Sequence, residues 1–222
     1  MSARSALIQA AKHGDDEELQ RLLGEGVPTG EVDSKGRTAL HHACSKCHPE
    51  CVRLLLGAGS DANQPDARGG TTLHHACAVG SADCLALLLD ASANVDQTDG
   101  DGGTALHDAS TQSPDCLRLL LQARAAIDVA DAVGETPLSC ASRDGVPDCV
   151  QILLECGAST GGVEAGMALM GACANGNTSC AALLIAARVD VGFMSVVSGT
   201  ALHEAVRPSE AQTPDQPVIF CE

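Results

Sequence analysis

Thr38-Ala39-Leu40-His41-His42-Ala43 is one copy of a six-residue phrase that recurs along the whole chain. Further copies begin at Thr71, Thr104 and Thr200, and weaker ones at Ser5, Thr136 and Met167. Successive copies start 31 to 33 residues apart. A fixed period of this length is typical of stacked repeat arrays, so the repeat, and not the length of 222 residues, decides the domain organisation.

Each repeat contains signals for a turn and two short helices, as residues 33–66 show. The segment 33–37 has the composition of a tight turn, and Thr38 lies where its hydroxyl can cap the first helix. Pro49 can open the second helix, whose apolar stripe includes Leu54 and Leu55. One helix pair cannot bury this stripe alone, so neighbouring pairs are expected to stack.

The unit resembles the ankyrin repeat in its D-x-x-G turn, its T-x-L-H-x-A opening and its leucine-rich second helix with a Gly-Ala tail. The resemblance covers residues 3–206, within an array at 1–206. It implies an all-α solenoid of stacked helix-turn-helix units joined by β-hairpin loops, with a concave face. The expected units are 3–33, 34–66, 67–99, 100–131, 132–162, 163–195 and a partial unit at 196–206.

Several copies depart from this pattern. The copies are counted here from the one at Thr38, which is the first full copy. In the fifth copy the turn Asp and Gly become Gly162 and Ala165, and in the sixth Ser195 and Ser198 stand there. These hairpins are therefore expected to be looser or differently shaped. The third copy is one residue short before Cys116. Cys47 stands where Gly is usual, which predicts a left-handed turn at a non-glycine residue.

The last copy has no second helix, and residues 207–222 are rich in proline and polar residues, which predicts disorder. Capping repeats normally cover the terminal apolar face of an array. We therefore expect residues 190–222 to fray in isolation, and the chain to be a fragment or isoform of a longer protein unless another segment covers this face.

Composition narrows the class of partner. The net charge of −16 opposes binding to phosphate backbones and anionic membranes, and an aromatic content of 1% opposes stacking on bases. There is no apolar run of transmembrane length and no signal peptide pattern. We expect an intracellular monomer, cytoplasmic and/or nuclear, that binds another protein and needs no cofactor.

We interpret the twelve cysteines mainly as packing residues. Cys51, Cys84, Cys116, Cys149 and Cys180 share one column before the second-helix leucines. A column repeated once per unit is a packing position, and free thiols are expected inside cells. A weak zinc candidate combines Cys44, Cys47, His48 and Cys51, but the repeat already explains Cys44 and Cys51. The alternative for Cys47 is a reactive thiol beside Lys46 and His48.

The recurring Thr and His residues are interpreted as structural. In ankyrin repeats this His makes hydrogen bonds that tie neighbouring loops together. One active site would not explain the same His in four units, so we expect no enzyme. The residues concerned are Thr38, His41, Thr71, His74, Thr104, His107, Thr136, Thr200 and His203.

Function is expected to lie in the residues that vary between repeats, at the hairpin tips and on the exposed face of the first helices. The candidate partner-binding residues are Lys35, Arg37, His42, Lys46, Arg68, His75, Asp101, Asp108, Glu135 and Arg143. The tips change from basic to acidic along the array, which suits a partner segment of the opposite order, acidic then basic.

Three functions remain open at this stage. The first is a protein-binding scaffold or adaptor. The second is substrate recognition for a ubiquitin ligase, because second helices such as 114–121 resemble those of ankyrin–SOCS-box proteins, although no SOCS box is visible. The third is a thiol- or metal-responsive module at Cys47.

Overall fold

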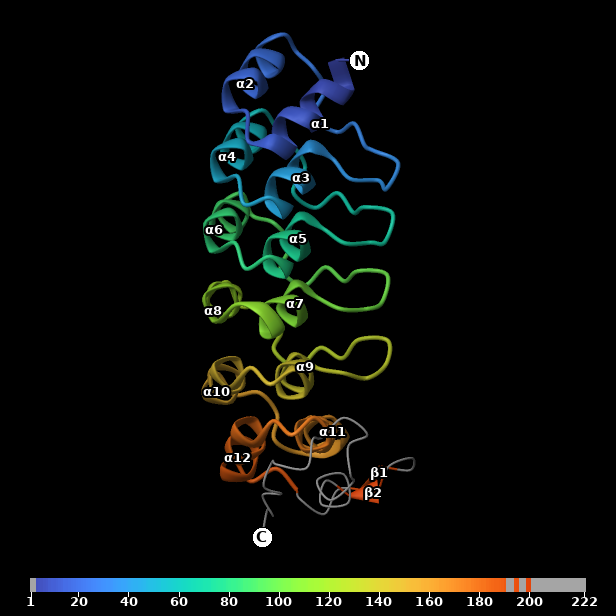
Figure 1. The fold of residues 1–222 in the computed structure, drawn as a ribbon, viewed down its shortest axis with the longest axis vertical. Helices are drawn as coiled ribbons and strands as arrows, with labels where there is room; N and C mark the ends of the chain where they lie inside the picture. The colour runs from blue at the N-terminus through green and yellow to red at the C-terminus, as the bar shows by residue number, and fades with distance from the viewer. Residues whose placement is uncertain (1–2, 191–193, 196–198, 201–222) are drawn as a thin grey trace, which may run out of the picture. The chain divides into compact units, whose positions relative to one another are not determined.

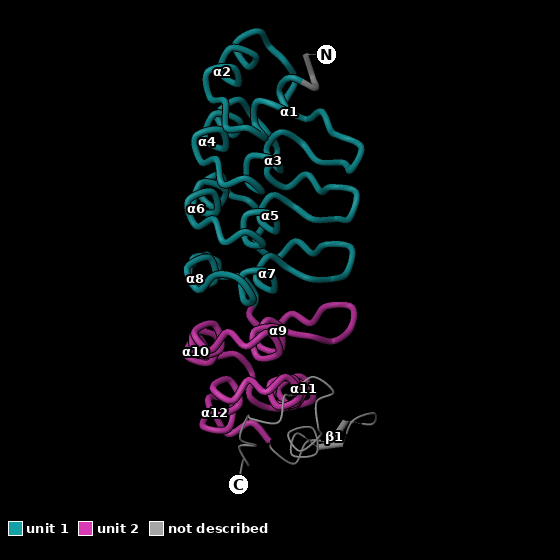
Figure 2. The backbone as a smooth tube through the Cα atoms, in the orientation of Figure 1, with its two compact units in different colours: residues 1–126 teal, residues 127–222 magenta. Residues whose placement is uncertain are grey.

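The computed structural model describes residues 3–190, 194–195 and 199–200. These residues form twelve helices and two two-residue strands. The expected disorder of residues 207–222 and most of the expected fraying of 190–222 fall outside them. The chain divides into two compact units, Met1–Ala126 and Ile127–Glu222 (Figure 2).

Unit 1 contains four helix pairs (Figure 1). Its first helices are α1 (Ala3–His13), α3 (Ala39–Ser45), α5 (Thr72–Ala78) and α7 (Ala105–Gln112). Its second helices are α2 (Asp16–Gly24), α4 (Pro49–Gly57), α6 (Ala82–Asp90) and α8 (Pro114–Gln122). Successive first helices pack together, as do successive second helices, and the loops before α3, α5 and α7 project from the first-helix row.

Unit 2 contains two further pairs. The first helices are α9 (Pro137–Asp144) and α11 (Gly162–Ala174), and the second helices are α10 (Pro147–Glu155) and α12 (Thr178–Ala186). Two short antiparallel strands follow, β1 (Met194–Ser195) and β2 (Gly199–Thr200).

The core is built from small side chains and leucines in repeating columns. Leu40 and Ala43 of α3 are fully buried, as are Cys51 and Leu55 of α4. All five cysteines of the second-helix column are at most 1% exposed, which confirms that they are packing residues. The described cysteines are all free thiols.

Left-handed backbone appears nine residues after the start of most copies, between the two helices. Glycines hold it at Gly14, Gly80, Gly145 and Gly176, and Cys47 holds it with φ of 56°. The predicted left-handed Cys47 is therefore confirmed. In the shortened third copy, Ser113 is extended and serves both as the C-cap of α7 and as the N-cap of α8.

The fifth copy differs from expectation more than any other described copy. Where a modified hairpin was expected around Gly162 and Ala165, the chain winds into α11, which has 13 residues. The segment has no Asp to accept the backbone N–H groups of a tight turn, and it is rich in Ala and Met, which favour helix. The residues that would have formed the hairpin therefore extend the first helix.

Candidate partner-binding surface

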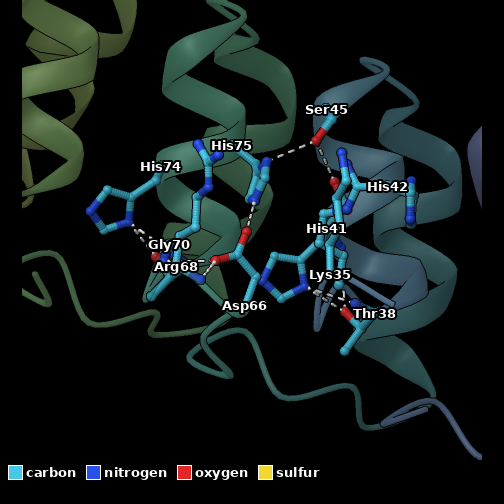
Figure 3. Close-up of polar contacts among 12 residues, drawn as sticks. Lys35, Thr38, His41, His42, Ser45, Asp66, Arg68, Gly70, His74 and His75 are labelled. Carbon is cyan, nitrogen blue, oxygen red and sulfur yellow. Dashed lines mark hydrogen bonds and ion pairs between the residues drawn. The ribbon is translucent and has the colours of Figure 1, made fainter. Parts of the chain in front are cut away.

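Four hairpin-like loops, here called fingers, precede α3, α5, α7 and α9 and comprise residues 33–37, 66–70, 99–103 and 131–135. Asp66 shows how each is closed (Figure 3). Its Oδ1 accepts hydrogen bonds from the N–H groups of Arg68 at 2.8 Å and Gly70 at 3.1 Å, and its own N–H donates to the Gly70 carbonyl at 2.9 Å. Asp33, Asp99 and Asp131 make the same set of bonds. A carboxylate therefore closes each finger turn by accepting two backbone hydrogen bonds.

In unit 1 the finger tips are also bonded to one another. The N–H of Ala67 donates to the Lys35 carbonyl at 2.9 Å, and the N–H of Gly100 donates to the Arg68 carbonyl at 2.7 Å. A Cβ on Gly36 would lie 2.6 Å from the nitrogen of Ala67, so only glycine permits this approach. Lys35 and Arg68 are thereby fixed one repeat apart.

The structural histidines hold the base of each finger. His74 Nδ1 accepts hydrogen bonds from the N–H of Thr71 at 3.1 Å and from its hydroxyl at 2.9 Å. Its Nε2 then carries the proton and donates to the carbonyl of Gly103 in the next finger at 3.2 Å. His74 therefore ties neighbouring loops, as the resemblance implied.

The other predicted Thr–His pairs make the same bond at Nδ1 where they are described, although His41 Nε2 is buried without a hydrogen-bond partner. His41 Nδ1 accepts from the N–H of Thr38 at 3.1 Å, and His107 Nδ1 from the N–H of Thr104 at 3.0 Å. His203 and the side chain of Thr200 lie outside the described residues.

Unit 2 uses a serine where unit 1 uses histidine. Ser139 occupies the His position, next to the Thr136 hydroxyl at 3.2 Å, and donates to the carbonyl of Glu164 at 3.2 Å. The sequence pattern of this copy predicts only a weakened repeat. The hydroxyl at the fourth place of the phrase was the signal that could have indicated a preserved loop contact.

Two of the candidate binding residues turn out to be internal partners of the fingers. The expectation that His42 is exposed is wrong, because its side chain is 7% exposed and its Nε2 lies 2.9 Å from Asp33 Oδ2. His75 Nε2 lies 3.0 Å from Asp66 Oδ2 (Figure 3), and the His75 side chain is 23% exposed. In both repeats the imidazole Nε2 contacts the Asp Oδ2, because the backbone N–H groups of the turn use Oδ1.

The third repeat places a carboxylate where the first two place imidazole. Asp108 stands at the position of His42 and His75, beside Asp99. Burial and the charge of Asp99 raise the pKa of Asp108 to about 7. By contrast, although burial raises it, hydrogen bonds from the Arg37 backbone and from His42 hold the pKa of Asp33 well below its usual range.

The remaining candidates divide into exposed residues and residues held in ion pairs. Lys35, Lys46, Arg68 and Asp101 are exposed. Arg37 folds back on Asp33, with Nη2 2.9 Å from Oδ2. In unit 2, Arg143 forms ion pairs with Glu135 and with Asp144. The candidates of unit 1 that are exposed are therefore Lys35, Lys46, Arg68 and Asp101.

The weak zinc candidate is not assembled. Cys44 and Cys51 are buried in the core, whereas Cys47 is exposed. The Cys51 thiol donates to Asp16 Oδ1 at 2.9 Å. Burial, and to a smaller extent this hydrogen bond, raise the pKa of Cys51 to about 12. In the part of the chain that the structure describes, no three His, Cys, Asp or Glu side chains are grouped to hold a metal ion.

Comparison with known proteins identifies the family. The family model for ankyrin repeats matches three times, at residues 7–99, 47–131 and 91–163. The chain therefore belongs to the ankyrin repeat family, as its fold and its repeated phrase indicate. A search of curated proteins by sequence gives no match.

Among solved structures, the chain is similar to the human ASB11 ankyrin repeat domain. The TM-score is 0.83 and the sequence identity 31%, over 93% of this chain and 94% of that one. This similarity supports an ankyrin solenoid and a protein interaction module. No described helix is long and apolar enough to cross a membrane.

Proposed function

We propose that this chain is a non-enzymatic, intracellular adaptor that binds a partner protein through its finger tips and first-helix face. The observation that carries the proposal is the pair of backbone bonds that fix the tips of unit 1 in register. Lys35 and Arg68 project from these tips, and neither side chain joins an ion pair within the described residues. A preorganised row of free charges lowers the entropy cost of binding.

The test compares two triple variants in a quantitative pull-down from cell lysate. The finger variant carries Lys35→Ala, Arg68→Ala and Asp101→Ala. The control carries Arg53→Ala, Asp83→Ala and Arg118→Ala, which removes the same charges from exposed positions on the second helices. We expect the finger variant to lose a partner that the parent and the control retain. Equal recovery by both variants would refute binding through the fingers.

Substrate recognition for a ubiquitin ligase is a second candidate function. It is favoured by the resemblance of helices such as α8 to those of ankyrin–SOCS-box proteins and by the similarity to the human ASB11 ankyrin repeat domain. The same pull-down tests it: ligase subunits that co-purify with the parent would support this role, and a partner set without them would not.

A further inference from the structure

Along the three repeats of unit 1 that carry a finger, the charge of the finger and its first helix changes in one direction. Residues 33–46 carry three basic and one acidic residue, residues 66–79 carry one of each, and residues 99–112 carry three acidic and no basic residue. The formal net charge, with histidine neutral and every Asp ionised, therefore runs from +2 through 0 to −3 over consecutive repeats.

The partner of the turn Asp also differs along these repeats. In the first repeat Asp33 forms an ion pair with Arg37 and a hydrogen bond with His42, whereas Lys35 at the tip is exposed. In the third repeat the finger and first helix contain no Lys or Arg; Asp101 is exposed, and the charge of Asp99 acts on Asp108. The carboxylates there lack the imidazole that the same site holds in the two preceding repeats.

The spacing of these charges sets the form of a complementary partner. Helices α3, α5 and α7 pack in sequence, and packed helices lie about 8–10 Å apart. A polyproline-II chain rises about 3.1 Å per residue and has three residues per turn, so one repeat corresponds to roughly three residues of a bound segment, and every third side chain lies on the same side. One extended segment can therefore present one side chain to each repeat.

We infer that this face binds an extended protein segment in which two acidic side chains meet Lys35 and Arg68 and one Lys or Arg side chain meets the carboxylates of the third repeat. The three charged residues stand at intervals of roughly three, in either chain direction. The inference rests on the proposed function and adds the chemistry of the partner. The basic side chain takes the place that imidazole fills in the neighbouring repeats, and it relieves the repulsion between Asp99 and Asp108.

A display library of random 12-residue peptides, selected against the full chain, tests this pattern. We expect enrichment of peptides with two acidic residues and one basic residue at three-residue intervals, and no enrichment of the charge-inverted pattern. Peptides without a charge pattern, or no enriched peptide at all, would overturn the inference.

Charge exchange in one enriched peptide gives the second readout, by fluorescence anisotropy. Lys35→Glu should weaken binding roughly two- to fivefold, and changing the outer acidic residue of the peptide to Lys should restore it on this variant alone. Asp108→Asn should weaken binding of the parent peptide, but not of a peptide whose basic residue is Ala. Changes below twofold in both variants would overturn the inference.

The two proposals can fail separately. If the finger variant loses its protein partner while the library shows no charge pattern, only the inferred partner chemistry fails. If the finger variant keeps every partner, binding through the fingers fails as well.

Discussion

Asp108 faces Asp99 in the third repeat, where the two preceding repeats place a histidine against the corresponding Asp. Two carboxylates in a half-buried site repel each other. The presence of Asp instead of His at this position therefore replaces a hydrogen bond by a repulsive pair. The repulsion destabilises the folded state at this site, but the two carboxylates can bind a positively charged group.

Asp108→Asn should stabilise the chain at pH 8. The carboxyl has a pKa of about 7 when folded and about 4 when unfolded, so its protonated form favours the fold below pH 4 and this advantage is lost as the pH rises through 7. We expect the variant to raise the free energy of unfolding by roughly 1–3 kcal/mol at pH 8 and to change it less at pH 5. Urea unfolding at both pH values measures this, and a larger gain at pH 5 would refute the repulsive pair.

His74→Ala should cost about 2–4 kcal/mol of unfolding free energy, because it leaves the Gly103 carbonyl and the Thr71 N–H without their partner and opens a cavity. His13→Ala serves as the matched control, since His13 is exposed and bonds only locally. We expect the control to stay within about 0.5 kcal/mol of the parent. Similar losses for both variants in chemical denaturation would contradict the loop-tying role.

The buried histidines should make the protein sensitive to mild acid. Burial and the nearby His75 lower the pKa of His41 to about 4, whereas an unfolded histidine titrates near 6.5. The unfolded chain therefore binds more protons between these values, and stability is lost as the pH falls from 6.5 towards 4.

The measurement is the pH dependence of unfolding for the parent and for His41→Gln. We expect the variant to lose roughly 1–3 kcal/mol less than the parent over this range. Asp108 acts in the opposite direction in both proteins, so it cancels in the comparison. Parallel curves would show that His41 is not neutral in the fold.

Cys47→Gly should raise the free energy of unfolding by about 0.5–1 kcal/mol, because a side chain at φ of 56° is strained and other repeats use glycine there. Gly59→Ala is the opposite control: Gly59 has φ of 82° and open space around its Cβ direction, so only backbone strain is added. A stabilising Gly59→Ala or a destabilising Cys47→Gly would contradict this reasoning.

The repeated elements could be predicted from the sequence because their signals are local. Thr38 and His41 are three residues apart in one helical turn, and the cysteine column recurs once per repeat from Cys51 onward, at the same place in each second helix. The contact between His42 and Asp33 spans nine residues and depends on how the finger folds back on the helix, so the helical pattern alone suggested an exposed residue.

The same limit applies to Asp108 and to α11. The repulsion between Asp108 and Asp99 can be recognised only once Asp108 is aligned with His75 and is known to lie near Asp99. In α11, the loss of the turn Asp was visible, but whether the freed residues would form a loose hairpin or additional helix depended on packing against α9.

The central claim, that a partner protein contacts the fingers, is tested most directly by photo-crosslinking. A benzophenone amino acid would replace Lys35 or Arg68 at the tips, and Arg53 or Arg118 on the second helices, in otherwise unchanged chains in cell lysate. We predict that one partner crosslinks from both tip positions and from neither second-helix position. A partner captured from Arg53 or Arg118 but not from the tips would contradict the account.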